Sequence, residues 1–186
     1  YGRYIKNNDG SYSFDWSGST VQGGFNGTEI AVVLSSRSVS GASSDYMAYS
    51  IDGGAYKKFQ LSQGIKKRTY TLETGLSDGY HTITLSKCTE GAYSTIVTFY
   101  GFDYLSGEPA KAPARPSRSI EFIGDSITAG SGSESTGAGN FKLAEENFLK
   151  TYAYYTANEL NASFSCVAVS GAGVYQNTEG NRDIAI

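Results

Sequence analysis

A serine lies where an apolar run of the sequence ends and a polar, glycine-rich segment begins. Residues 119–123 are rich in β-branched and aromatic side chains, as in a buried strand, and the run breaks at Gly124 before Asp125 and Ser126. A serine at such a turn holds its Oγ at the carboxyl edge of a sheet, where open α/β folds bind ligands. Its backbone N–H can face a developing oxyanion, and the sharp turn is favoured by a residue without a Cβ. Ser126 is therefore a candidate nucleophile; the alternative is an ordinary turn with Asp125 or Ser126 as a helix N-cap.

The string Gly-Asp-Ser-Ile-Thr at residues 124–128 resembles the first sequence block of the SGNH (GDSL-like) esterase superfamily. The preceding chain is similar to the β-sandwich that opens carbohydrate esterase family 2, with its motifs at residues 16–19, 25–30 and 78–83 in that order. Enzymes of that family deacetylate plant polysaccharides. The resemblance implies that Ser126 attacks the acetyl carbonyl and lends its own N–H to the oxyanion. Because Asp125 is adjacent to Ser126 in the sequence and would point away from it, Asp125 is expected to order the turn rather than act as a base.

A second glycine-rich turn follows residues 163–169, which have the pattern of a strand. This turn reads Ser-Gly-Ala-Gly, and it resembles the second block of the superfamily, in which a glycine donates its backbone N–H to the oxyanion hole. Gly171 is the first choice for that donor and Gly173 the second. An ordinary glycine turn after a strand accounts for the pattern equally well.

Two groups that the resemblance requires are not found in the sequence: an asparagine that donates to the oxyanion and a catalytic histidine near the carboxyl end. The only histidine, His81, lies in an expected strand of the other domain, alternating with Ile83 and Leu85, and is interpreted as structural. The sequence is thus expected to be the first part of a longer enzyme. Taken alone it is expected to be inactive, since a serine hydroxyl without a base is a weak nucleophile.

The elements that must position these residues suggest a multidomain β plus α/β protein. Residues 12–105 hold short alternating runs separated by turn signals, which indicates a jelly-roll-like β-sandwich domain over residues 1–105. Strands are expected at residues 28–35, 46–51, 56–59, 67–73, 80–87 and 94–105. The aromatic residues of this part are interpreted as core and cross-strand packing rather than a sugar-stacking platform.

The remaining chain divides into a linker and an incomplete α/β domain. Residues 106–118 hold all three prolines, which predicts an extended spacer without ladder hydrogen bonds. By the same resemblance, residues 119–186 are expected to be the first part of an SGNH-type α/β domain. A helix is expected over residues 143–160, with Glu145 and Glu146 in its first turn, and the helix crossing makes the strands on either side of it parallel.

Composition restricts the classes of partner. Of the 186 residues 18% are charged, and the net charge of −3 with no strong basic cluster excludes a nucleic-acid or anionic-membrane surface. No apolar run reaches the ~20 residues of a membrane span. Cys88 and Cys166 are interpreted as buried free thiols, with an interdomain disulfide as the alternative. No Cys/His spacing fits a metal site, so no metal and no cofactor is expected.

The function that the resemblance implies is a secreted serine esterase that removes O-acetyl groups from plant cell-wall polysaccharides such as acetylated xylan or mannan. The supporting residues of its site are Gly124, Asp125 and Gly173, around Ser126 and Gly171. The alternative belongs to another class of protein: a non-catalytic glycan-binding β-sandwich with a degenerate esterase tail.

Overall fold

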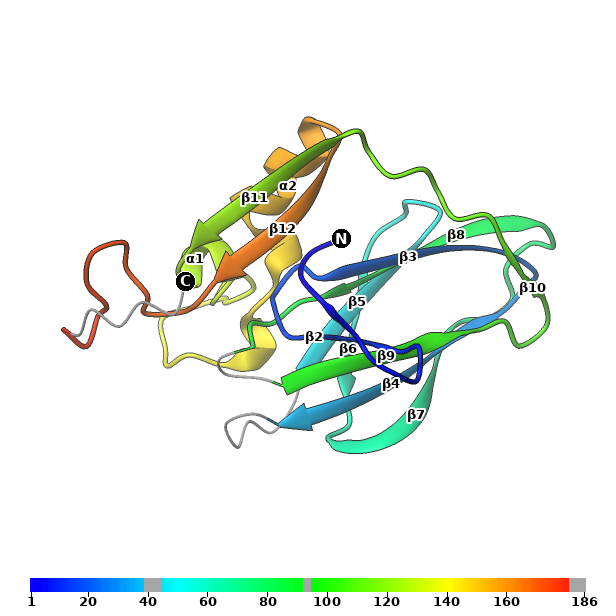
Figure 1. Ribbon diagram of the computed structural model, residues 1–186, viewed down its shortest axis with the longest axis horizontal. Coiled ribbons are helices and arrows are strands. Elements are labelled where there is room, and N and C mark those ends of the chain that lie inside the picture. The colour runs from blue at the N-terminus through cyan, green and yellow to red at the C-terminus, as the bar shows by residue number, and fades with distance from the viewer. Residues whose placement is uncertain (39–44, 92–94, 181–186) are drawn as a thin grey trace.

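The computed structural model describes residues 1–38, 45–91 and 95–180. Most of the chain forms two antiparallel five-stranded sheets that face one another (Figure 1). The first sheet has the order β1 (Ile5–Lys6), β2 (Tyr12–Phe14), β9 (Thr95–Asp103), β4 (Ile30–Ser38), β7 (Gly64–Glu73). The second has the order β10 (Glu108–Ala110), β3 (Thr20–Asn26), β8 (Tyr80–Lys87), β5 (Asp45–Ile51), β6 (Lys57–Leu61).

The two sheets enclose a hydrophobic core of their own. Alternate apolar side chains of the strands point inward, as the period of two along a strand requires. The buried members are Phe14, Phe25, Ile30, Val32, Leu34, Met47, Tyr49, Leu61, Leu72, Ile83, Leu85 and Val97. The predicted β-sandwich is confirmed, and the strand expected at residues 80–87 has those bounds in the structure. The strand expected at residues 28–35 instead begins at Ile30 and runs to Ser38.

The proline-rich segment contributes a strand to the sandwich, so the expectation that it makes no ladder pairing is wrong. β10 pairs antiparallel with β3, with Pro109 opposite Phe25. β10 is the edge strand of its sheet, the position at which sheets tolerate proline. The rest of the segment leads directly into β11 (Arg118–Gly124).

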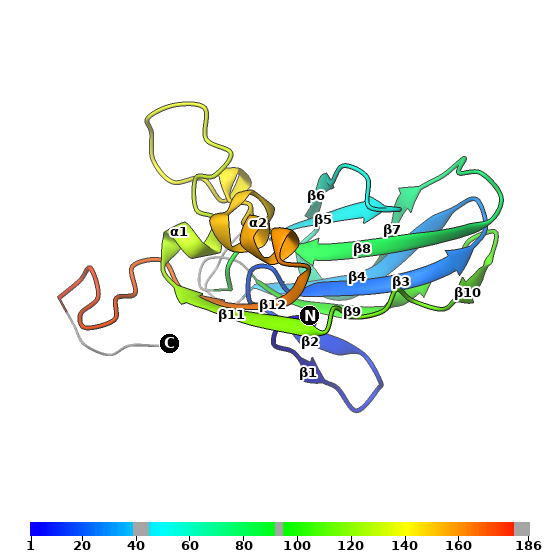
Figure 2. The same ribbon diagram turned by 90° about the horizontal axis from the view of Figure 1, so that it is seen from above.

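The last part of the described chain is a two-stranded parallel sheet with helices against it. β11 pairs with β12 (Ala162–Ala168), from Arg118 opposite Ala162 to Gly124 opposite Ala168. Both arrowheads point to the same end, where α1 (Ser126–Ala129) begins (Figure 1). The second helix, α2 (Tyr152–Glu159), lies over one face of the pair (Figure 2). The start of an α/β domain with parallel strands is confirmed.

The single helix expected over residues 143–160 is wrong. The structure has two short 3-10 turns, η1 (Leu143–Glu145) and η2 (Phe148–Lys150), before α2. Asn147 is extended at φ −152° and its side chain caps the second turn, while Thr151 caps α2, so two capping residues interrupt the helical period. Glu146 is not in an exposed first turn but is fully buried.

A second core joins the sandwich to the α/β part. It contains Ala48 and Cys88 from the sandwich, packed with Phe148, Phe164 and further residues of the α/β part. Both cysteines are buried and free, as interpreted from the sequence. Cys166 Sγ lies 3.6 Å from Ser17 Oγ across this boundary, and burial raises the pKa of the Cys166 thiol to about 11. Among the helices of the described residues, none is both long and apolar enough to cross a membrane.

Candidate active site

The turn between β11 and α1 is tight because Gly124 touches the helix that follows it. A Cβ built on Gly124 would lie 2.1 Å from the Thr128 Oγ1, so any other residue would push α1 away. Asp125 is the N-cap of α1 and its carboxylate accepts the N–H of Ile127 at 3.0 Å. The carboxylate is therefore engaged in ordering the turn, the role that the sequence suggested for it.

Ser126 is the first residue of α1 and is half-buried. Its carbonyl accepts the N–H groups of Gly130 and Ser131, which close the short helix. Within the described part of the chain, neither its Oγ nor its N–H has a hydrogen-bond partner. Both groups are thus available to a ligand at the carboxyl edge of the two strands.

The turn after β12 lies beside Ser126 at the same edge of the sheet. The Val169 N–H donates to the Gly124 carbonyl at 3.1 Å, one residue past the end of the strand pairing. Gly171 follows at φ +84°, in the left-handed region that favours glycine, and no described residue accepts its N–H. The Gly173 N–H donates to Asn177 Oδ1 at 3.0 Å. Of the two candidate donors, Gly173 is occupied and Gly171 is open.

His81 lies in the sandwich, on β8, where it pairs with Phe25 of β3. Its Nδ1 is 2.6 Å from Asp52 Oδ2 and its Nε2 is 2.8 Å from the Ser77 carbonyl. Because both partners are acceptors, both ring nitrogens carry a proton when both bonds form. The bond to Ser77, followed by that to Asp52, raises the pKa of His81. The ring is buried and fully engaged in the sandwich, so it is a structural residue, as interpreted.

Metal-ligating groups do not gather anywhere in the part of the chain that the structure covers: no cluster of three or more His, Cys, Asp or Glu side chains is found there. At the turns after β11 and β12, the Ser126 hydroxyl is a group of the kind that can attack a carbonyl carbon, and the open N–H groups of Ser126 and Gly171 are of the kind that can stabilise an oxyanion.

Two buried carboxylates next to this edge have no signal in the sequence. Glu90, from the sandwich, accepts hydrogen bonds from the backbone N–H and the hydroxyl of Ser170, the residue before Gly171. Glu146 accepts the backbone N–H of Glu90 at 2.5 Å. Burial, together with the neighbouring charge of Glu90, raises the pKa of Glu146 to about 8. These partners are 56 and 80 positions apart, a separation at which single-sequence patterns predict no contact.

Comparison with known proteins gives one family for the N-terminal part. Residues 1–113 match the family model described as Carbohydrate esterase 2 N-terminal. The chain is 39% identical over 166 residues to the cellulase/esterase CelE of Acetivibrio thermocellus. The matched region covers 89% of this chain and 19% of that protein. It is 36% identical over 122 residues to an acetylxylan esterase / glucomannan deacetylase of Cellvibrio japonicus, covering 61% of this chain and 32% of that protein.

Solved structures are similar over nearly the whole chain. A family two carbohydrate esterase from Clostridium thermocellum, in complex with cellohexaose, has a TM-score of 0.87 at 36% identity and covers 96% of this chain and 53% of its own. A family two carbohydrate esterase from Cellvibrio japonicus has a TM-score of 0.86 at 22% identity over 98% of this chain and 52% of its own, which shows a shared fold. The chain thus spans about half the length of these solved proteins and a smaller share of the curated ones.

Proposed function

This chain belongs to carbohydrate esterase family 2, and from that membership we propose that it is part of an enzyme that removes O-acetyl groups from plant cell-wall polysaccharides with Ser126 as nucleophile. The observation that carries the proposal is the placement of Ser126 and Gly171 on adjacent turns at one edge of a parallel strand pair. The relative named as an acetylxylan esterase / glucomannan deacetylase supports acetylated xylan or mannan as the substrate class. The cellohexaose complex of another relative supports a site that accepts a polysaccharide chain.

In the proposed reaction, Ser126 Oγ attacks the acetyl carbonyl carbon and forms a bond to it as its proton passes to a base. The carbonyl oxygen becomes an oxyanion held by the N–H groups of Ser126 and Gly171. The bond from the carbonyl carbon to the sugar oxygen then breaks, and the sugar hydroxyl leaves with a proton. Water hydrolyses the acetyl-serine in the same way, releasing acetate and restoring the serine.

The base and a third oxyanion donor are proposed to be a histidine and an asparagine of the full-length protein outside this sequence. Support comes from the described residues, among which none supplies a base to Ser126, and from the chain's span of about half its solved relatives. The polymeric substrate supports a further proposal, that the enzyme acts outside the cell. No cofactor takes part in the proposed steps.

The test is Ser126→Ala in the full-length protein, assayed on acetylated xylan and on an aryl acetate. Hydrolysis is expected to fall by several orders of magnitude with the fold unchanged, because a nucleophile and its base act as a unit. Ser131→Ala is the matched control: this serine lies in the same turn and bonds to Ser126 through its backbone N–H. Near wild-type hydrolysis by Ser126→Ala would remove Ser126 from the site. Polysaccharide binding without any Ser126-dependent hydrolysis would favour the glycan-binding alternative.

A further inference from the structure

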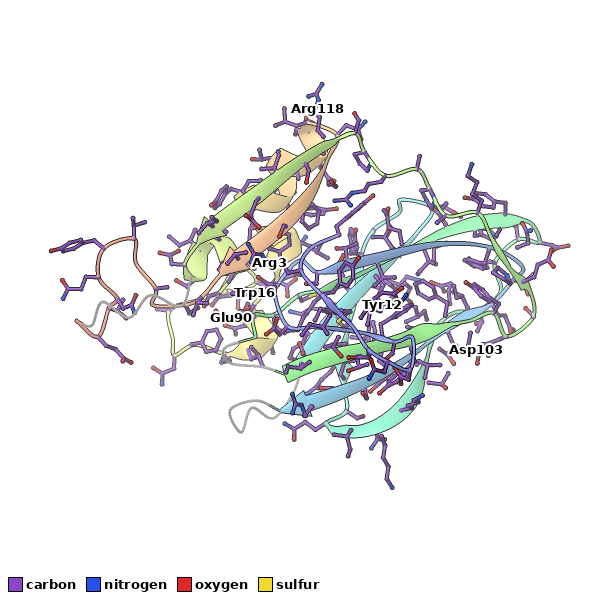
Figure 3. The ribbon with its side chains drawn as sticks, in the orientation of Figure 1. Arg3, Tyr12, Trp16, Glu90, Asp103 and Arg118 are labelled. Carbon is purple, nitrogen blue, oxygen red and sulfur yellow. The ribbon has the colours of Figure 1, made fainter. Side chains whose placement is uncertain are left out.

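Glu90 of the sandwich reaches into the α/β part beside the proposed oxyanion turn. It follows β8 closely, is fully buried, and lies near the carboxyl end of β12 (Figure 3). Its Oε2 accepts the Ser170 backbone N–H at 2.7 Å, and its Oε1 accepts the Ser170 hydroxyl. Both oxygens of one carboxylate therefore hold one residue, the one that immediately precedes Gly171.

The backbone around Glu90 is itself fixed by the α/β part. The Glu90 N–H donates to Glu146 Oε1, and the Phe148 N–H donates to the Cys88 carbonyl at 3.0 Å. Residues 88–90 are thus bound on one side by the segment around Glu146 and Phe148, and on the other by Ser170. A carboxylate anchored in this way does not follow the motions of a free side chain, so it can set the position of what it binds.

Burial of the charged Glu90 carboxylate is energetically unfavourable. Burial raises the pKa of Glu90, and the two hydrogen bonds from Ser170 and the nearby charge of Lys87 oppose that rise. Lys87 is itself fully buried, 3.2 Å from Asp45 Oδ1. Buried charges of this kind are often less stabilising than apolar residues of the same volume. A positioning role explains why a charged group occupies this place.

The geometry of the Ser170 turn shows how such a role would reach the reaction. The peptide that joins Ser170 to Gly171 carries the open Gly171 N–H, and the Glu90 carboxylate fixes the residue on the amino side of that peptide. On the carboxyl side, the Gly171 carbonyl accepts the Thr178 N–H at 3.0 Å. The direction of the Gly171 N–H therefore depends on contacts at both ends of the turn.

We propose that Glu90 is a positioning residue of the esterase. Through Glu90, the sandwich orients the Gly171 N–H toward the oxyanion that forms when Ser126 attacks the acetyl group. The inference rests on the proposed function of Ser126 and Gly171. It assigns the sandwich a part in the reaction: the sandwich provides a wall of the catalytic centre, and loss of its carboxylate weakens binding of the transition state without weakening binding of the ground-state substrate.

The experiment compares Glu90→Ala, Glu90→Gln and Ser170→Ala in the full-length protein, with the melting temperature measured for each. Glu90→Ala is expected to lower kcat about 10- to 100-fold with KM within about threefold, since displacing an oxyanion donor by an ångström costs on that order. Affinity for an alkyl boronic acid, whose tetrahedral adduct on a serine imitates the oxyanion, should fall by a similar factor. Glu90→Gln should recover most of kcat, because its carboxamide oxygen can accept the Ser170 N–H and its NH₂ can donate to the hydroxyl. Ser170→Ala, which keeps one of the two bonds, should lie between them.

Glu134→Gln is the matched control for a loosened boundary between the two parts. Its carboxylate is 2.6 Å from the Lys58 Nζ of the sandwich and touches neither Ser170 nor Gly171. It should leave kcat and boronic acid affinity unchanged.

If Glu90→Ala does not fold, Ser170→Ala and Glu90→Gln still decide the matter, since unchanged kcat in Ser170→Ala overturns the inference. An equal loss of kcat in Glu134→Gln, or a loss in Glu90→Ala confined to KM, overturns it as well. A wild type without Ser126-dependent hydrolysis overturns the proposed function together with this inference, whereas a Ser126-dependent enzyme indifferent to Glu90→Ala overturns the inference alone.

Discussion

Gly124 is the residue on which the position of Ser126 depends most directly. We expect Gly124→Ala to destabilise the protein by about 1–3 kcal/mol, because the new methyl group overlaps the Thr128 side chain. Relief of that overlap moves α1, so the proposed esterase activity of the full-length protein should fall ~100-fold. Gly137→Ala is the control, since a Cβ at Gly137 meets nothing within 4 Å. Melting temperature and kcat measured for both variants check the prediction, which fails if the two behave alike.

Glu146 predicts a pH dependence of stability. Its pKa is raised from 4.5 to about 8 by burial and by the charge of Glu90. The folded chain therefore holds this proton where the unfolded chain has released it, and stability falls as the pH rises between those two values. At pH 7 the cost is about 3 kcal/mol, at about 1.4 kcal/mol for each pKa unit. Two other charged groups of the same cluster also act on the pKa of Glu146: the charge of Lys87 lowers it and the charge of Asp45 raises it.

Glu146→Gln should remove that cost. Its amide oxygen can still accept the Glu90 N–H, so the variant is expected to be more stable than wild type at pH 7 and nearly equal to it at pH 4. Denaturant unfolding of both proteins from pH 4 to pH 8 measures the difference. The raised pKa of His81 also makes stability fall with rising pH, but it does so in both proteins and cancels in the comparison. A difference independent of pH would contradict a protonated Glu146.

At the scale of elements, the sequence predicted the strands better than it predicted residues 143–160, which lie between β11 and β12. Alternation and turn residues located β8, because an antiparallel strand with one buried face carries its pattern locally. The helix expected over residues 143–160 was wrong because Asn147 and Thr151 each cap a separate short helix. Glu146, just before Asn147, also turns inward toward Glu90, a contact made across 56 positions. Local periodicity contains no information about such a partner. For the same reason the residues around Ser126 were enough to predict it as a site residue, whereas no local pattern pointed to the contact between Glu90 and Ser170.

β10 is expected to stabilise the sandwich although it lies in the proline-rich segment. A polypeptide of residues 1–113 should melt several degrees above one of residues 1–105, because β10 pairs with β3 and covers its backbone donors. The family model for the N-terminal part also extends to residue 113. Thermal unfolding followed by circular dichroism compares the two polypeptides. Equal midpoints would mean that β10 contributes nothing to the sheet.

The described residues form two hydrophobic cores, one of which belongs to the sandwich alone. Because no described residue of the α/β part belongs to that core, residues 1–113 are expected to fold independently. The isolated polypeptide should show a β-type circular dichroism spectrum and one cooperative transition. Its midpoint should lie below that of the 186-residue chain, since Ala48 and Cys88 lose the side chains that bury them. A broad, non-cooperative transition would argue against the division of the chain into domains.

The contact between Glu90 and Ser170 also has a consequence for the order in which the chain folds during synthesis. Its two residues are separated by 80 positions, so on a ribosome adding ~5–20 residues per second Glu90 emerges roughly 4 to 16 s before its partner. The sandwich can complete its own core in that interval. The turn that contains Ser170 is then synthesised when the surface of the sandwich has already formed. Limited proteolysis of nascent chains of increasing length should therefore find the sandwich resistant before the α/β part. Synthesis from the amino end thus builds the template before the part that is shaped on it.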